Sequence, residues 1–198
     1  NQSLYRKLHP DDEMHRYQRR LECLKAIQDT GYQTGTGVMI GLPYQTMGDL
    51  ADDIIFMRDF DIDMCGMGPY IEHSDTPLGE RGTDHRLLKE RFNLSLRMIA
   101  ILRIVMRDIN IVASTAMQTI DPAGREKAVS CGSNVVMPNL TPARYREGYR
   151  IYEVKPGYNE VNESNVSGLN PDLIPGITIG LGIWGDTPHY GRRLGRKK

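Results

Sequence analysis

Short, uniformly apolar segments alternate with longer amphipathic ones along most of this chain, and that alternation constrains its fold more than any other feature. The apolar segments are typical of buried strands, and they cover residues 33–42, 62–69, 110–116 and 134–138. Helical periodicity fills the chain around them, over residues 11–30, 49–60, 85–107, 124–131 and 143–152. Strands that are apolar throughout and joined by helical crossovers form a parallel sheet that is buried on both faces. The pattern therefore predicts an α/β fold with parallel strands.

The four predicted strands, each with its helix, correspond to half of an eight-stranded (β/α) barrel of the TIM type. A parallel half on its own would leave two unpaired edges, which natural proteins avoid. We therefore expect residues 1–155 to form a half-barrel that a longer N-terminal chain completes; completion by a second copy is the alternative. After residue 155 the pattern dissolves, and residues 156–198 are expected to form a loop-rich extension. It ends in a basic tail over residues 191–198, of a kind that is usually solvated and mobile.

The charge balance argues against several classes of partner. The 25 basic and 25 acidic side chains cancel, so no overall positive field attracts a nucleic-acid backbone. The longest apolar run, residues 98–106, contains Arg103 and is too short to span a membrane. The polar start of the chain shows no targeting signal. We therefore expect a cytoplasmic protein that binds neither nucleic acid nor a membrane.

The three cysteines, Cys23, Cys65 and Cys131, are too widely spaced for a zinc, redox or ferredoxin-like motif. Each lies in an apolar segment, so we expect small buried side chains in a reducing compartment. The five histidines are scattered without a partner at helical spacing. No metal site is therefore predicted in this chain.

In a parallel barrel, functional residues lie at the carboxyl ends of the strands and in the loops that follow. This rule selects residues 39–43, 68–73, 113–119 and 137–139. They contain no clustered carboxylate pair and no nucleophile beside a base, so no catalytic residue is predicted. Glu72 and His73 could act as a base or a ligand, but such a pair in a surface loop is usually a solvated turn. The hydroxyls, thioethers and backbone groups of this rim suit a small polar ligand, with a cofactor carrying the difficult chemical step.

Four segments around this rim match a known family in colinear order. They are residues 31–46, 63–78, 114–120 and 134–142. Here the chain resembles the biotin-synthase-like radical S-adenosylmethionine (SAM) enzymes and, among them, the FeFe-hydrogenase maturases rather than biotin synthase. The resemblance implies the C-terminal half of a radical SAM barrel, in which a 4Fe–4S cluster reduces SAM to a 5′-deoxyadenosyl radical. That radical would act on an iron–cysteine precursor of the hydrogenase cluster, a small organometallic molecule, and other hydrogenase maturation proteins would be partners.

The resemblance also implies roles for individual residues. Arg20 resembles the helix arginine that helps to hold the SAM carboxylate, a task that suits the fork of a guanidinium. Pro69, Tyr70 and Ile71 would lie against the adenosyl group. The other matched positions line the family's substrate cavity, and they are Met64, Ser114, Thr115, Met137, Tyr149 and Tyr152. A surface arginine at position 20 and core-filling methionines at 64 and 137 are the plainer alternatives.

The chain also departs from the family pattern. The three-cysteine cluster motif and a SAM-contacting glutamate have no counterpart here, so the resemblance implies that an absent N-terminal half binds the cluster and that the chain alone is inactive. Another biotin-synthase-like enzyme, of the methylornithine or biotin synthase type, is an alternative that residues 137–141 argue against. A non-catalytic half-barrel that binds a small ligand is the second alternative.

Overall fold

The structure is a computed structural model that describes residues 1–79, 85–138, 141–142, 144–145 and 168–195. Its elements are α1 (Gln2–Leu8), η1 (Glu13–His15), α2 (Tyr17–Asp29), β1 (Gly35–Ile40), α3 (Met47–Asp59), β2 (Met64–Pro69), α4 (His85–Val105), β3 (Asn110–Ala113), α5 (Thr115–Ile120), α6 (Gly124–Ser130), η4 (Pro171–Leu173) and α7 (Pro188–Gly195). None of the described helices combines the length and the apolar character that a membrane crossing requires.

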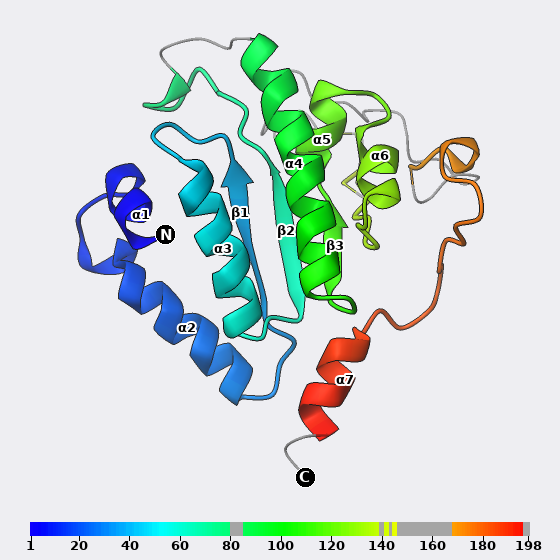
Figure 1. Ribbon diagram of the computed structural model, residues 1–198, viewed down its shortest axis with the longest axis horizontal. Coiled ribbons are helices and arrows are strands. Elements are labelled where there is room, and N and C mark those ends of the chain that lie inside the picture. The colour runs from blue at the N-terminus through cyan, green and yellow to red at the C-terminus, as the bar shows by residue number, and fades with distance from the viewer. Residues whose placement is uncertain (80–84, 139–140, 143, 146–167, 196–198) are drawn as a thin grey trace.

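The sheet contains three strands in the order β1-β2-β3, and both neighbouring pairs are parallel (Figure 1). The predicted α/β class with parallel strands is confirmed, while the complete barrel stays a prediction. The fourth strand expected over residues 134–138 is wrong, because in that segment only Val135 forms a single parallel bridge, with Val112. Pro138 has no N–H with which to continue a ladder. The helix predicted over residues 143–152 lies almost entirely outside the described residues.

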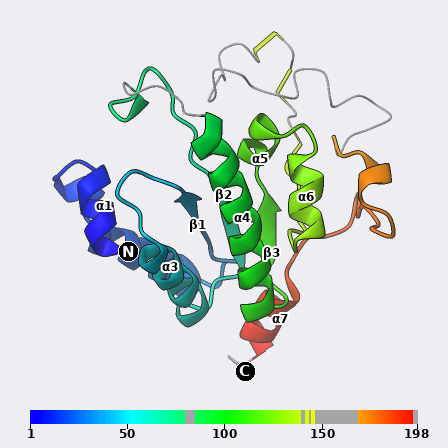
Figure 2. The ribbon, with the colours of Figure 1, turned by 45° about the horizontal axis from the view of Figure 1, so that its top comes forward.

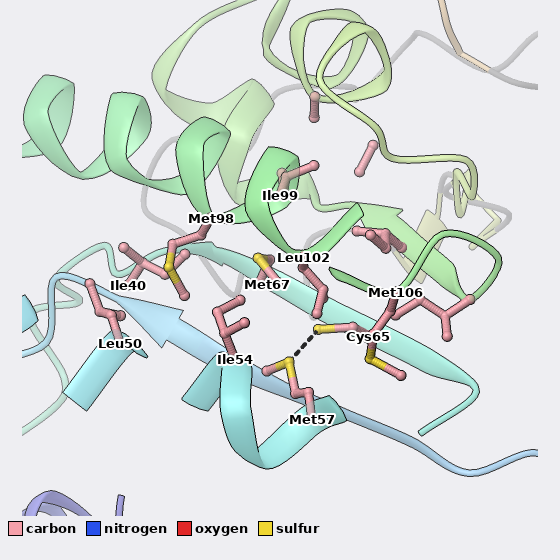
Figure 3. Packing of buried hydrophobic residues seen from close by; sticks show 14 of the residues in the cluster. Ile40, Leu50, Ile54, Met57, Cys65, Met67, Met98, Ile99, Leu102 and Met106 are labelled. Atoms are coloured by element: carbon pink, nitrogen blue, oxygen red, sulfur yellow. Dashed lines mark hydrogen bonds between the residues drawn. The ribbon is translucent and has the colours of Figure 1, made fainter. Parts of the chain in front are cut away.

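One face of the sheet and the helices α3 and α4 enclose the hydrophobic core (Figures 1 and 3). Fully buried Ile40, Cys65 and Ile111 from the three strands belong to one cluster with Met57 of α3 and Leu102 of α4. Their removal from water is the main stabilising contribution to this layer. Residues 35–40, 64–69 and 110–113 therefore have fixed positions from which the loops at the carboxyl edge extend.

Strand β1 is not buried on both faces as the sequence predicted. Its exposure alternates along the strand, and the side chain of Met39 is 54% exposed. The cause is that Ile40 and Val38 face the core cluster, whereas the described residues leave the opposite face of β1 uncovered at Met39. Successive strand residues point to opposite faces, so Met39 lies on the face that is opposite to the buried Ile40.

Side-chain caps mark the starts of α3 and η1. The start of α3 has a capping box, in which Thr46 and Asp49 each accept from the backbone N–H of the other. The single helix predicted over residues 11–30 is wrong at its start, because Asp12 caps the short η1 by accepting from the His15 N–H. Arg16 then has an extended backbone, and α2 begins only at the next residue.

The third strand is also shorter than predicted. Its pairing with β2 stops at Met67 and Ala113, and Ser114 becomes the N-cap of α5. The Met117 N–H donates to the Ser114 carbonyl at 3.1 Å, which begins the helical turn. Thr115 therefore lies in a helix rather than at the end of a strand.

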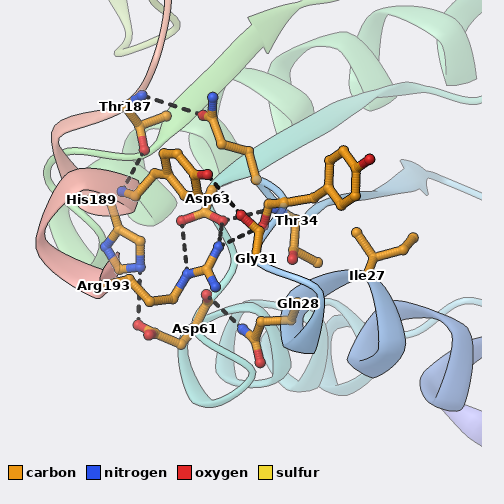
Figure 4. A network of polar contacts seen from close by, with 12 residues as sticks. Ile27, Gln28, Gly31, Thr34, Asp61, Asp63, Thr187, His189 and Arg193 are labelled. Atoms are coloured by element: carbon orange, nitrogen blue, oxygen red, sulfur yellow. Dashed lines mark hydrogen bonds and ion pairs between the residues drawn. The ribbon is translucent and has the colours of Figure 1, made fainter. Parts of the chain in front are cut away.

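The C-terminal helix α7 lies at the end of the sheet where the strands begin, away from the arrowheads (Figures 1 and 2). Arg193 on α7 is only 7% exposed and forms an ion pair with the fully buried Asp63, just before β2 (Figure 4). The expectation of a solvated, mobile basic tail is therefore wrong for Arg193, since the buried carboxylate of Asp63 needs a cationic partner. Residues 196–198 lie outside the described part of the chain.

Candidate functional site

The carboxyl edge of the sheet brings the ends of β2 and β3 into contact. A Cβ placed on Gly68 would lie 2.3 Å from the Ser114 Oγ, so the glycine leaves the room that this serine occupies. The Ser114 Oγ is buried and has no hydrogen-bond partner among the described residues. Buried hydroxyls are rarely left without a partner in native proteins. Ser114 therefore presents an unused hydrogen-bonding group at the edge where a barrel enzyme holds its ligand.

The segment after β2 is held in place on both sides. The Tyr70 N–H donates to the Ile40 carbonyl at 2.8 Å, which extends the pairing with β1. The Tyr70 carbonyl accepts from Arg91 Nη1 at 3.0 Å. Burial raises the pKa of the Tyr70 phenol, and the nearby Glu72 carboxylate raises it further, which keeps the phenol neutral. Pro69 and Tyr70 are buried and Ile71 is half-buried, so this segment is fixed and mostly apolar.

Glu72 is not part of a solvated turn, contrary to the sequence interpretation. Its carboxylate accepts from Arg91 at 2.7 Å, and the two side chains are only 11% and 12% exposed. His73 is half-buried, and its Nδ1 accepts from the Asp75 N–H at 3.2 Å. Sequence reasoning did not identify Arg91, because a single arginine within a helical pattern carries no local signal of its partners.

The other predicted cavity residues lie in different elements. Thr115 is half-buried at the first position of α5, directly beside Ser114. Met137 is 60% exposed. Met64 begins β2 and pairs with Gly35 and Asn110, so it lies roughly 16 Å along the strand from Pro69. Thus Ser114 and Thr115 share the carboxyl edge with Pro69, while Met64 lies at the amino end.

Two of the predicted cavity residues, Tyr149 and Tyr152, lie outside the described residues. Arg20 on α2 is exposed, and its Nε donates to the Tyr5 hydroxyl at 3.4 Å. It lines a cavity of about 460 Å³ between α2, α3 and the free edge of β1. Neither Tyr70 nor its two neighbours line that cavity. Arg20 and residues 69–71 therefore lie in different parts of the structure, and their contact with one ligand stays a prediction.

The cysteines do not come together in the structure. Cys65 is fully buried in β2, where its thiol donates to the Met57 sulfur at 3.4 Å, and burial raises its pKa to about 12. Cys131 is half-buried at the end of α6. Cys23 is exposed, which corrects its expected burial; α2 has no fully buried residue. Among the described residues, no group of three His, Cys, Asp or Glu side chains could hold a metal ion.

The fold defines an α/β protein of parallel strands and helical crossovers. Its candidate ligand groups lie at the carboxyl edge of the sheet, where the neighbouring strands β2 and β3 end. No family model matches the chain. The chain is 48% identical over 155 residues to the FeFe hydrogenase maturase subunit HydE of Thermotoga maritima, a match that covers 78% of this chain and 42% of that protein. The chain thus spans less than half the length of this relative. The resemblance stated from the sequence is confirmed, and the match is consistent with a C-terminal portion of HydE.

Proposed function

We propose that this chain is the C-terminal half of the barrel of a radical SAM enzyme that matures FeFe-hydrogenase. The observation that supports this most is the 48% identity to HydE over 155 residues. At this level of identity over most of the chain, a relative usually shares its fold and its site geometry. The parallel sheet with an unpaired strand edge at β1 agrees with a half-barrel that further strands extend.

SAM, bound beside a reduced 4Fe–4S cluster, would supply a 5′-deoxyadenosyl radical that acts on an iron–cysteine precursor. The dispersed thiols of Cys23, Cys65 and Cys131 do not fit such a cluster, so its ligands would come from another part of a longer protein. The product would pass to other hydrogenase maturation proteins. By itself the chain would be inactive.

The residues of this chain would bind and orient. Tyr70 and its neighbours fit a contact with the flat, uncharged adenosyl group, because their surface is apolar and its backbone is held by hydrogen bonds. Arg20 would reach the SAM carboxylate with its charge. The unused hydroxyl of Ser114, together with Thr115, would direct the substrate. Met64, Met137, Tyr149 and Tyr152 would complete the cavity wall.

The test uses the full-length protein, purified without oxygen, reconstituted with iron and sulfide and reduced with dithionite. We expect it to convert SAM to methionine and 5′-deoxyadenosine, and to restore hydrogenase activity in a strain that lacks its own maturase. A protein that cleaves SAM and does not restore hydrogenase would be another biotin-synthase-like enzyme. A protein that does neither would refute the proposal.

A further inference from the structure

One arginine of α4 contacts the loops that follow two different strands. The Nη1 of Arg91 donates both to the Tyr70 carbonyl, at 3.0 Å, and to the Glu72 carboxylate, at 2.7 Å. Its guanidinium carbon lies 5.3 Å from the centre of the Tyr70 ring. Its aliphatic stem packs against Gly41 after β1, where a Cβ would come within 2.2 Å of the Arg91 Cγ. Arg91 therefore links the ends of β1 and β2 from the helix side.

These contacts fix the backbone where β2 leaves the sheet. The Tyr70 carbonyl is past the last pairing of β2 with β1 and would have no ladder partner there. Because one nitrogen holds both this carbonyl and the side chain of Glu72, it restricts the backbone between residues 70 and 72. The pair is largely shielded from water, so its hydrogen bonds are stronger than those of an exposed pair.

We propose that Arg91 is a positioning residue that holds the Pro69–Tyr70–Ile71 segment in the conformation that receives the adenosyl group of SAM. This inference rests on the proposed function. Arg91 acts through Tyr70 and Glu72 and needs no contact with the ligand itself. Without Arg91, residues 69–71 would be free to move before SAM binds. SAM binding would then have to order them, and this loss of conformational entropy would weaken the binding.

The test compares two arginines of the same helix in the full-length, cluster-containing protein. Arg91→Met keeps the stem that packs on Gly41 and removes the charge and the hydrogen bonds. Arg103→Met is the matched control, because Arg103 also holds backbone carbonyls, those of Gly132 and Ile109, but near the opposite end of α4. The measurements are the SAM dissociation constant by calorimetry, the melting temperature, and amide hydrogen exchange followed by mass spectrometry.

We expect Arg91→Met to raise the SAM dissociation constant roughly tenfold, the effect of losing about one charge-assisted hydrogen bond. Exchange should accelerate in residues 70–73 without a comparable change elsewhere. Arg103→Met should lower the melting temperature and leave the dissociation constant unchanged. Glu72→Gln retains the Arg91 bond to Tyr70, so it should raise the SAM dissociation constant by less than Arg91→Met does. This variant keeps the test decisive if Arg91→Met does not fold.

An unchanged dissociation constant in both Arg91→Met and Glu72→Gln would overturn the positioning role. An equal increase of the SAM dissociation constant in Arg103→Met would also overturn it, because the effect would then reflect general destabilisation. In either case normal SAM binding and cleavage by the unmodified protein would leave the proposed function intact. Failure of the unmodified protein to bind SAM would overturn the function and this inference together.

Discussion

Replacing Arg193 by methionine should destabilise the protein far more than the same change at its neighbour Arg192. Arg193 forms an ion pair with Asp63, which is completely buried. Its Nη2 also donates to the Tyr32 carbonyl at 2.9 Å, and the Asp63 Oδ2 that accepts from this Nη2 also accepts from the Thr34 N–H, at 2.8 Å. The helix α7 is thereby joined to the amino end of the sheet.

The magnitude follows from what remains after the substitution. Methionine fills most of the space of the arginine stem, but the Asp63 carboxylate stays buried with no cation beside it. Breaking a buried pair in this way costs about 3–5 kcal/mol. Arg192 pairs with Asp108 on the surface and its side chain is 54% exposed. Surface pairs contribute about 0–1 kcal/mol, so Arg192→Met should have little effect.

The assay is urea unfolding of the full-length protein and of each variant, with the free energy of unfolding taken from the midpoint and slope. Amide exchange provides a local readout, since the Thr34 N–H loses protection if the Asp63 carboxylate moves toward water. The double variant Asp63→Leu with Arg193→Met removes both charges and should recover much of the lost stability. The reasoning is refuted if Arg193→Met destabilises no more than Arg192→Met.

Three further predictions concern the strands and the carboxyl edge. Iodoacetamide at pH 8 should modify exposed Cys23 and spare Cys65, whose pKa of about 12 leaves roughly one thiolate in ten thousand; rapid alkylation of Cys65 in peptide mapping would contradict its burial. Gly68→Ala should cost about 1–3 kcal/mol in urea unfolding, since its Cβ would overlap the Ser114 Oγ, whereas Gly66→Ala meets no atom within 4 Å and should change stability by under about 0.5 kcal/mol. Ser114→Ala should leave the melting temperature unchanged but lower the ratio of product to 5′-deoxyadenosine roughly tenfold; an activity loss that merely follows the loss of folded protein would remove Ser114 from the cavity.

The sequence was sufficient for the parts of the fold that local patterns determine. The helical spacing of apolar residues in α3 and the apolar run of β2 depend on residues that are close in the chain. Both elements occur within a few residues of the prediction. The failures involve competition between local and tertiary effects. Ser114 and Thr115 continue an apolar, β-branched run and suggest a longer strand, but the ladder to β2 has already ended at Ala113.

The charged residues of the site were harder to predict. The partners of Arg91 lie 19 and 21 positions earlier in the chain, and the partner of Arg193 lies 130 positions earlier. Such separations leave no periodic trace, so each arginine has the pattern of a solvated residue. The rule for parallel barrels located Tyr70 and Ser114 at the carboxyl edge, but neither this rule nor the resemblance indicated what holds that edge in place.

The charges at the two ends of the sheet limit what this chain can contribute to a ligand. At the amino end Arg193 is neutralised by Asp63, and at the carboxyl edge Arg91 is neutralised by Glu72. Neither cation is therefore available to compensate a ligand's charge. Among the described residues, the groups at the ends of β2 and β3 that the prediction assigns to a ligand are neutral: the apolar side chains around Tyr70 and the unused hydroxyl of Ser114. Under the proposed function, these described residues of the carboxyl edge would therefore suit an uncharged group such as the adenosyl ring, and the charge of Arg20 would suit the SAM carboxylate.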